Sequence, residues 1–374
     1  MNTVVRKLGQ IQASWDFGLD NMPSFDKAMQ RVYAWYENEI IDRAPIRFMA
    51  HNAFLESETD TLYQMNPEQR KKWWFDAELQ VENFSKSIDG RTFHAETFPV
   101  YFPNLGPDVY AGLYGAELEF GAVTSWSVPF VQKWEDSDKL ALDLNNIYFQ
   151  KIEELTRCAL DQCENKFMVG YTDLHPGLDC VAAWRDPQQL CFDMIDAPDQ
   201  VQQLVDLAIE DFETIYDHFD NLLKQAGQLS VSWMGIPSYG RMHIPSCDFS
   251  TMISPRFFEE FGLQILEREV QTMTHNIFHV DGKGVARHLN AILSVPEVHA
   301  IQWVQGVGDD LPIMQWVPFI KELQAKKVPI IVDLNLAELE SFMDEMNPQG
   351  LFLWVATENE QEELEILKRI ERWT

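Results

Sequence analysis

The sequence predicts an α/β protein of the (β/α)8 TIM-barrel class with helical additions at the N-terminus. Short segments rich in β-branched and aromatic residues alternate with helical segments of ten residues or more, and eight such strand segments can be counted. No G-x-G-x-x-G motif follows a strand near the start, which makes an open doubly wound sheet the weaker alternative. We expect residues 1–40 to form an N-terminal helical extension and residues 41–374 to form one barrel domain.

The predicted strands recur along the whole barrel domain, separated by helices. The strands are expected at residues 46–50, 92–100, 167–171, 229–233, near 277, 299–304, 328–332 and 351–356. The helices are expected at residues 67–87, 142–163, 198–225, 255–274, 285–294, 314–327, 336–346 and 358–374. Residues 235–254 are too long and too rich in proline, glycine and serine for an ordinary connection, which is typical of a functional loop.

The composition narrows the class of protein. Hydrophobic residues make up 46% of the chain, enough for a large core. The chain has 29 Lys and Arg against 59 Asp and Glu, a net charge of −30 that disfavours nucleic acid and anionic membranes as partners. Five cysteines without a close C-x-x-C pair favour a reducing compartment. With no signal-peptide pattern and no long apolar stretch, we expect a cytoplasmic protein that binds a small molecule, and a homodimer is compatible with the sequence.

One stretch, residues 276–284 (N-I-F-H-V-D-G-K-G), stands out as a candidate site. His279 and Asp281 lie two residues apart, so both project from the same face of a strand. Two glycines follow directly and allow the backbone to turn beside a ligand. This pattern is typical of a metal site or an acid/base pair, and equally of a buried structural His–Asp hydrogen bond.

Active sites of such barrels lie at the C-terminal ends of the strands. We therefore take the polar and aromatic residues that follow the predicted strands as candidates for the site. They are Asp173, His175, Asp179, Trp233, Tyr239, Cys247, His279, Asp281 and Trp303. Together with His279 and Asp281, Cys247 would give a sulfur, nitrogen and oxygen donor set that suits zinc with an open fourth position. The structural alternatives are a buried cysteine, aspartates that cap turns and a core tryptophan.

Several segments resemble the uroporphyrinogen decarboxylase superfamily. They are D-R-A-P-I-R-F, Y-T-D-L-H-P-G-L-D, C-D-F-S-T-M-I-S-P-R-F-F-E-E-F, F-H-V-D-G-K-G and I-Q-W-V-Q-G, in this order. The resemblance runs from about residue 40 to the end and implies a (β/α)8 barrel with N-terminal helical additions. True uroporphyrinogen decarboxylases carry an R-Q-A-G-R segment after the first strand and a G-H-G loop after the eighth. This chain has M-A-H-N-A-F and V-A-T-E at those places, without cations to hold a polycarboxylate.

The chain therefore resembles a separate branch, closer to the cobalamin-dependent methyltransferases of that superfamily. Their zinc sites use an H-x-C motif and a later cysteine, where this chain has His279, Asp281 and Asp333. The resemblance implies a zinc-dependent methyltransferase or demethylase that acts on a small methylated substrate. The corrinoid would be presented by a separate protein, because the D-x-H-x-x-G corrinoid fingerprint is missing from this sequence.

The predicted roles follow from this resemblance and from the strand positions. We expect His279, Asp281 and Cys247 to bind zinc, and His279, Asp281 and Asp173 to be catalytic. We expect His175, Asp179, Trp233, Tyr239 and Trp303 to bind the substrate. A metal-independent decarboxylase or lyase of a small acid is the alternative enzyme, and an inert binding or scaffold barrel is the alternative outside enzymes.

Overall fold

The computed structural model describes Trp15 and residues 17–373. Its largest sheet is a curled parallel sheet of 6 strands in the order β1-β10-β9-β8-β7-β6. These strands are β1 Ile46–Ala50, β6 Met242–His243, β7 His275–Asp281, β8 Ala300–Val304, β9 Ile330–Leu334 and β10 Leu351–Thr357. The expected strands near 46, 277, 299, 328 and 351 are confirmed. Their residues are mostly buried, as in a sheet covered on its outer face by helices.

A second parallel pair, β2 Val100–Tyr101 and β5 Met168–Val169, continues the curl. Single hydrogen bonds extend the sheet beyond its regular strands: the backbone N–H of Glu96 donates to Ile46 O, and that of Tyr171 donates to Val231 O. The result is a TIM-like barrel that is not fully closed. A small antiparallel hairpin, β3 Glu117–Phe120 and β4 Ser125–Val128, is inserted after β2.

Two predicted strands differ in the structure. Residues 92–98 are irregular, and β2 starts only at Val100. The segment 229–233 forms only one bridge, between Ser230 and Ser238, while β6 lies within the stretch that the sequence predicts to be a loop. The strand β6 is two residues long, so its sequence carries too little alternation to be recognised.

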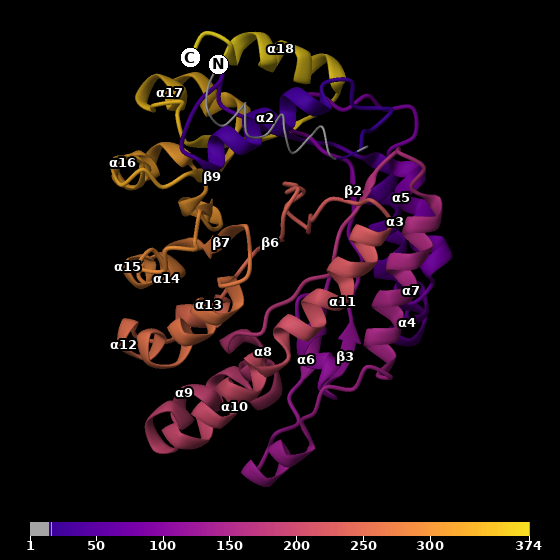
Figure 1. Ribbon diagram of the computed structural model, residues 1–374, viewed down its shortest axis with the longest axis vertical. Helices are drawn as coiled ribbons and strands as arrows, with labels where there is room; N and C mark the ends of the chain where they lie inside the picture. Colours follow the sequence, from indigo (N-terminus) through magenta and orange to yellow (C-terminus); the bar gives the residue numbers. More distant parts are fainter. Residues whose placement is uncertain (1–14, 16, 374) are drawn as a thin grey trace.

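Helices surround the strands, and α3, α5 and α7 lie on the opposite side of the molecule from α13–α16 (Figure 1). The main helices are α2 Phe25–Tyr36, α3 Ala53–Gln64, α4 Pro67–Trp74, α5 Ala77–Ser87, α6 Val109–Leu113, α7 Ile147–Gln162, α8 Leu178–Arg185, α9 Pro187–Asp196, α10 Pro198–Glu210 and α11 Phe212–Gln225. They continue with α12 Pro255–Phe257, α13 Leu263–Val270, α14 Gly282–Ala286, α15 Leu289–Ile292, α16 Val317–Ala325, α17 Leu339–Glu345 and α18 Glu360–Ile370.

Several predicted helices are interrupted, among them 285–294, which divides into α14 and α15. The segment 67–87 divides because Asp76 caps α5, its side chain accepting a hydrogen bond from the N–H of Leu79. The segment 198–225 divides at Asp211, and the segment 255–274 contains a π-helical turn, Phe258–Gly262. Of the predicted N-terminal extension, α2 is described, whereas residues 1–14 and 16 lie outside the described residues. Within the described chain, the helices are too short or too polar to cross a membrane.

Candidate active site

A cavity of about 700 Å³ opens beside the C-terminal ends of the central strands. Five of the residues singled out in the sequence line it, and they come from three separate parts of the chain: Asp173, His175, Asp179, Trp233 and His279. A cavity of about 790 Å³ lies elsewhere, between the outer faces of α5 and α7, and is lined by helix residues far from these groups. The strand-end cavity is therefore the candidate active site.

His279 projects from β7 into this cavity. Its Nδ1 lies 2.6 Å from Oε1 of Gln302, the residue directly beside it on β8. Because the amide oxygen can only accept, Nδ1 is the donor of this hydrogen bond, and Nε2 is the ring nitrogen that remains for a ligand. The ring of Trp233 packs against the imidazole edge to face, with 5.3 Å between the ring centroids. The imidazole is thus oriented from two sides, with Nε2 available to a ligand.

Asp248, His279 and Asp281 form a group of potential metal ligands, with one donor atom from each within 4.8 Å of the others. Asp281 ends β7, and Asp248 begins the 3-10 turn Asp248–Met252 after β6. Burial and the negative charge of Asp248 raise the pKa of the Asp281 carboxyl, against the opposing effect of His279. Two crowded carboxylates and a free imidazole nitrogen are a donor set that a divalent cation fits.

Cys247, the predicted sulfur ligand, is not a member of this group. Its side chain is buried, and burial together with the carboxylate of Asp179 raises the pKa of the thiol well above its usual value. The neighbouring Asp248 contributes its carboxylate in its place. The sequence contains both residues in S-C-D-F-S, but only the turn of the backbone decides which side chain reaches His279.

Asp173 and His175 form a close ion pair in the loop after β5. Asp173 Oδ1 lies 2.6 Å from His175 Nε2, and both side chains are largely buried. Burial opposes a charge on the imidazole, but the carboxylate of Asp173 outweighs this and raises the pKa of His175 to about 9. His175 is therefore protonated at neutral pH and can supply a proton to a ligand in the cavity.

Asp179 has a positioning role that the sequence does not reveal. From the first turn of α8 its two carboxylate oxygens accept hydrogen bonds from the backbone N–H groups of Asp248, at 3.0 Å, and Phe249, at 2.7 Å. Burial and the charge of Asp248 raise its pKa. Because these bonds hold the backbone of residue 248, Asp179 fixes the direction of the Asp248 side chain.

Two residues predicted to bind substrate lie away from the cavity. Trp303 is buried on the outer face of β8, between Trp316 and Phe319. Tyr239 precedes β6, and its backbone N–H donates to the hydroxyl of Tyr33, which packs on His275 at the start of β7. Tyr239 therefore lies near the opposite end of β7 from Asp281, about 20 Å away along a strand of this length.

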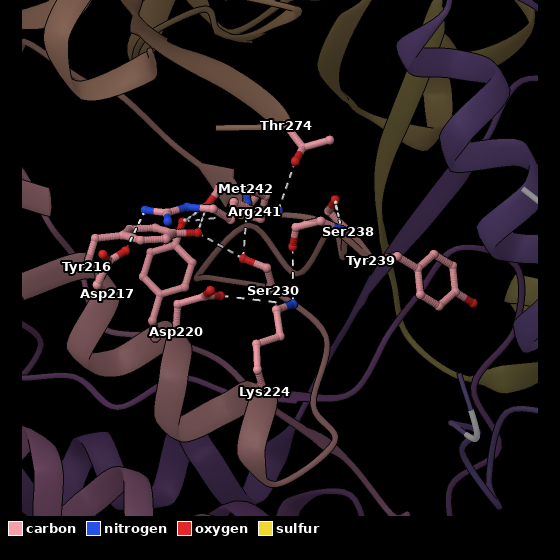
Figure 2. Close-up of polar contacts among 12 residues, drawn as sticks. Tyr216, Asp217, Asp220, Lys224, Ser230, Ser238, Tyr239, Arg241, Met242 and Thr274 are labelled. Carbon is pink, nitrogen blue, oxygen red and sulfur yellow. Dashed lines mark hydrogen bonds and ion pairs between the residues drawn. The ribbon is translucent and has the colours of Figure 1, made fainter. Parts of the chain in front are cut away.

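Figure 2 shows the surroundings of Tyr239, whose ring points away from a polar cluster at this end of the barrel. In the cluster, Arg241 pairs with Asp217 and stacks over the ring of Tyr216 at 4.7 Å. The hydroxyl of Tyr216 donates to the carbonyl of Met242 in β6. These contacts join α11 to β6, so this end of the barrel has a structural role.

Further residues line the cavity that sequence reasoning did not select. They are Pro107, Asp108, Trp126, Ser127, Pro129, Ala182, Ala183, Pro187, Ser246, Asp248, Phe249 and Met252. Two of them belong to the hairpin strand β4 and two to α8, and the others lie just before α6, just after β4, at the start of α9 and in the segment after β6. The hairpin is inserted after β2, and its alternation of exposed and buried residues is the only local signal for it in the sequence.

Comparisons with known proteins identify the fold. No family model matches the sequence, and no curated protein matches it. A solved structure of a methyltransferase from Methanosarcina mazei matches with a TM-score of 0.61 and 12% sequence identity, over 92% of this chain and 98% of that chain. At this identity the likeness shows the fold alone. The chain is thus similar in fold, over nearly its whole length, to a methanogen methyltransferase.

Proposed function

We propose that the protein is a methyltransferase-type barrel enzyme that takes the methyl group from a small substrate bound in the cavity. The observation that carries this proposal is the Asp248–His279–Asp281 group at the strand ends beside the cavity. The similarity in fold to a methyltransferase supports the reaction class, because it extends over 92% of this chain. Perturbed pKa values at Asp281 and His175 are typical of a functional site.

The donor set favours a divalent metal ion, with zinc as the first candidate. Asp248, Asp281 and His279 Nε2 would hold it, and zinc accepts imidazole and carboxylate ligands. A metal ion bound there would supply Lewis acidity toward the substrate. The hydrogen bond between His279 and Gln302 is the outer contact that metal-binding histidines commonly have.

Residues of this chain would supply the proton that the leaving heteroatom requires. The carbon of the methyl group would bond to a nucleophile such as a reduced corrinoid or a thiolate, as its bond to the substrate heteroatom breaks. The electron pair of that bond stays on the heteroatom, which would take a proton from His175. Asp173 keeps His175 charged for this step. A corrinoid would be carried by a partner protein.

Both alternatives are weaker on structural grounds. A decarboxylase of a small acid needs cations to hold the carboxylate, but the described residues that line the cavity include neither Lys nor Arg, which leaves His175 as the cationic group. An inert scaffold does not account for the buried, charged Asp173–His175 pair or for the crowded carboxylates beside the cavity.

Metal analysis of neighbouring variants tests the metal site. We expect close to one equivalent of metal in protein purified without chelator, and a loss of most of it in Asp248→Ala and His279→Ala. Cys247→Ala is the matched control, since it alters the adjacent side chain outside the donor group, and it should keep its metal. Protein that binds no metal under any of these conditions contradicts the proposed metal centre.

Methyl transfer is tested separately from metal binding. The metal-loaded protein is incubated with cob(I)alamin and a panel of methylated ethers, amines and sulfides, and methylcobalamin is detected by its absorbance. We expect one donor class to react, and His175→Ala to slow the reaction by roughly 100-fold, as for loss of a general acid. A panel without any transfer, to cobalamin or to a thiol, overturns the proposed reaction.

A further inference from the structure

The cavity has an unusual balance of charge. Four carboxylates line it (Asp108, Asp173, Asp179 and Asp248), and Asp281 lies beside Asp248. Against them stands one cationic side chain, His175, which Asp173 already neutralises. The lining within the described chain contains no Lys or Arg. Even with a divalent metal bound, the site would keep a net negative charge, and a low-dielectric wall strengthens its field.

Asp108 is the carboxylate in this cavity without an assigned task. It occupies the N-cap position of α6, but its side chain makes no capping hydrogen bond there. Instead Oδ2 accepts the backbone N–H of Ser127 at 2.8 Å, and the described residues place no Lys or Arg in an ion pair with it. Burial raises the pKa of Asp108, as does the nearby charge of Asp173, against the lowering effects of the Ser127 N–H and of His175. The carboxylate is thus held toward the cavity with a second oxygen available.

The aromatic side chain of Trp126 belongs to the same cavity lining as Asp108. Ser127, which fixes the carboxylate, follows directly after Trp126 in β4, and both residues line the cavity. The indole N–H of Trp126 donates to Glu119 at 3.1 Å, which holds the ring on the hairpin. A carboxylate and an indole ring in one cavity lining are a combination that binds alkylated ammonium groups, by charge and by cation–π attraction.

We propose that the substrate is an organic cation, with an ammonium or sulfonium group bound between Asp108 and Trp126 and a separate methylated heteroatom beside Asp248 and His279. This inference rests on the proposed function, because it names the substrate class of the same cavity. The proline and alanine side chains of the cavity lining would contact the alkyl groups of the cation. An anionic substrate would face repulsion from at least four carboxylates.

Three probes of similar shape and different charge test the inference. They are tetramethylammonium, neopentyl alcohol and pivalate, titrated calorimetrically into the full-length, metal-loaded protein. We expect tetramethylammonium to bind about tenfold more tightly than neopentyl alcohol, and pivalate to bind most weakly. Neopentyl alcohol or pivalate binding as tightly as tetramethylammonium overturns the inference.

Variants locate the binding group. Asp108→Asn should weaken tetramethylammonium about tenfold and leave neopentyl alcohol unchanged, because the amide keeps the size and loses the charge. Trp126→Leu, on the partly exposed hairpin, should weaken the cation severalfold without a risk to the core. Asp196→Asn, an exposed residue of α9, is the control for lost charge and should leave all three affinities unchanged. Equal losses in Asp108→Asn and Asp196→Asn would assign the preference to the overall charge and overturn the proposed site.

The proposed methyl transfer and the proposed cationic substrate can be refuted independently of each other. Selective cation binding by a protein that transfers no methyl group overturns the proposed reaction and leaves the charge preference standing. Methyl transfer from neutral donors, with no preference for tetramethylammonium over neopentyl alcohol, overturns the substrate class alone.

Discussion

Nδ1 of His279 and Oε1 of Gln302 lie 2.6 Å apart on neighbouring strands of the barrel. The buried amide engages Nδ1, so Nε2 is the nitrogen that remains for a ligand in the group of His279, Asp248 and Asp281. We expect Gln302→Leu to lower metal affinity by roughly 10–100-fold, the usual effect of losing such an outer contact. Competition with a chelator measures it. Gln302→Glu is the control, because a carboxylate still accepts from Nδ1, and a Gln302→Leu protein with unchanged affinity would contradict the role.

The ion pair of Asp173 and His175 makes stability depend on pH. The folded-state pKa of His175 is raised to about 9, above its ordinary value of 6.5. The pair's contribution is therefore fully present below pH 6.5 and is lost as the pH rises through 9, by roughly 3 kcal/mol. Urea unfolding across this range should show the loss in the wild type and a flatter profile in Asp173→Asn. Parallel profiles for the two proteins would show that Asp173 does not hold the proton.

Glu96 joins the start of β1 to the N-terminal helical region. It is fully buried and accepts hydrogen bonds from Arg43 at 2.9 Å and from the backbone N–H of Ile46 at 2.7 Å, with Arg31 at 3.1 Å. Removal of the carboxylate leaves buried Arg43 without its ion-pair partner, whereas Arg31 keeps its contacts with Asp42. We expect Glu96→Ala to lower the free energy of unfolding by roughly 3–5 kcal/mol, with a smaller loss in Glu96→Gln. Metal content should stay unchanged, and a stable Glu96→Ala protein would refute this account.

Gly282 turns the chain directly after Asp281. Its φ is +70°, and a side chain at this position would meet open space, so only the backbone conformation opposes a larger residue. Gly282→Ala should therefore cost about 1–2 kcal/mol of unfolding free energy, and Gly282→Asn less, because Asn tolerates the left-handed region. Chemical denaturation compares the two. If alanine is tolerated as well as asparagine, the turn has another conformation in solution.

The barrel strands were predictable where burial gives continuous apolar runs. The strands β7–β10 are each at least five residues long and mostly buried. Each is therefore visible in the sequence as an apolar run. The strand β6 and the hairpin β3–β4 were not predicted, because two residues, or a short half-exposed pair of strands, carry little periodicity. The breaks in the helices depend on single residues such as Asp76, whose capping is visible only once its partner is known.

The candidate site, too, was predictable from the sequence only in part. His279 and Asp281 are recognisable from the sequence because their spacing on a strand forces both side chains to one face. The choice of Asp248 over Cys247 was decided by the tertiary structure, since Asp179 on α8 holds the loop backbone and so aims one of two adjacent side chains. The positions of Tyr239 and Trp303 away from the cavity, and of Asp108 and Trp126 within it, likewise depend on how distant segments pack. Strand periodicity is local and can be deduced from the chain, whereas the direction of a loop side chain is set by partners far away in sequence.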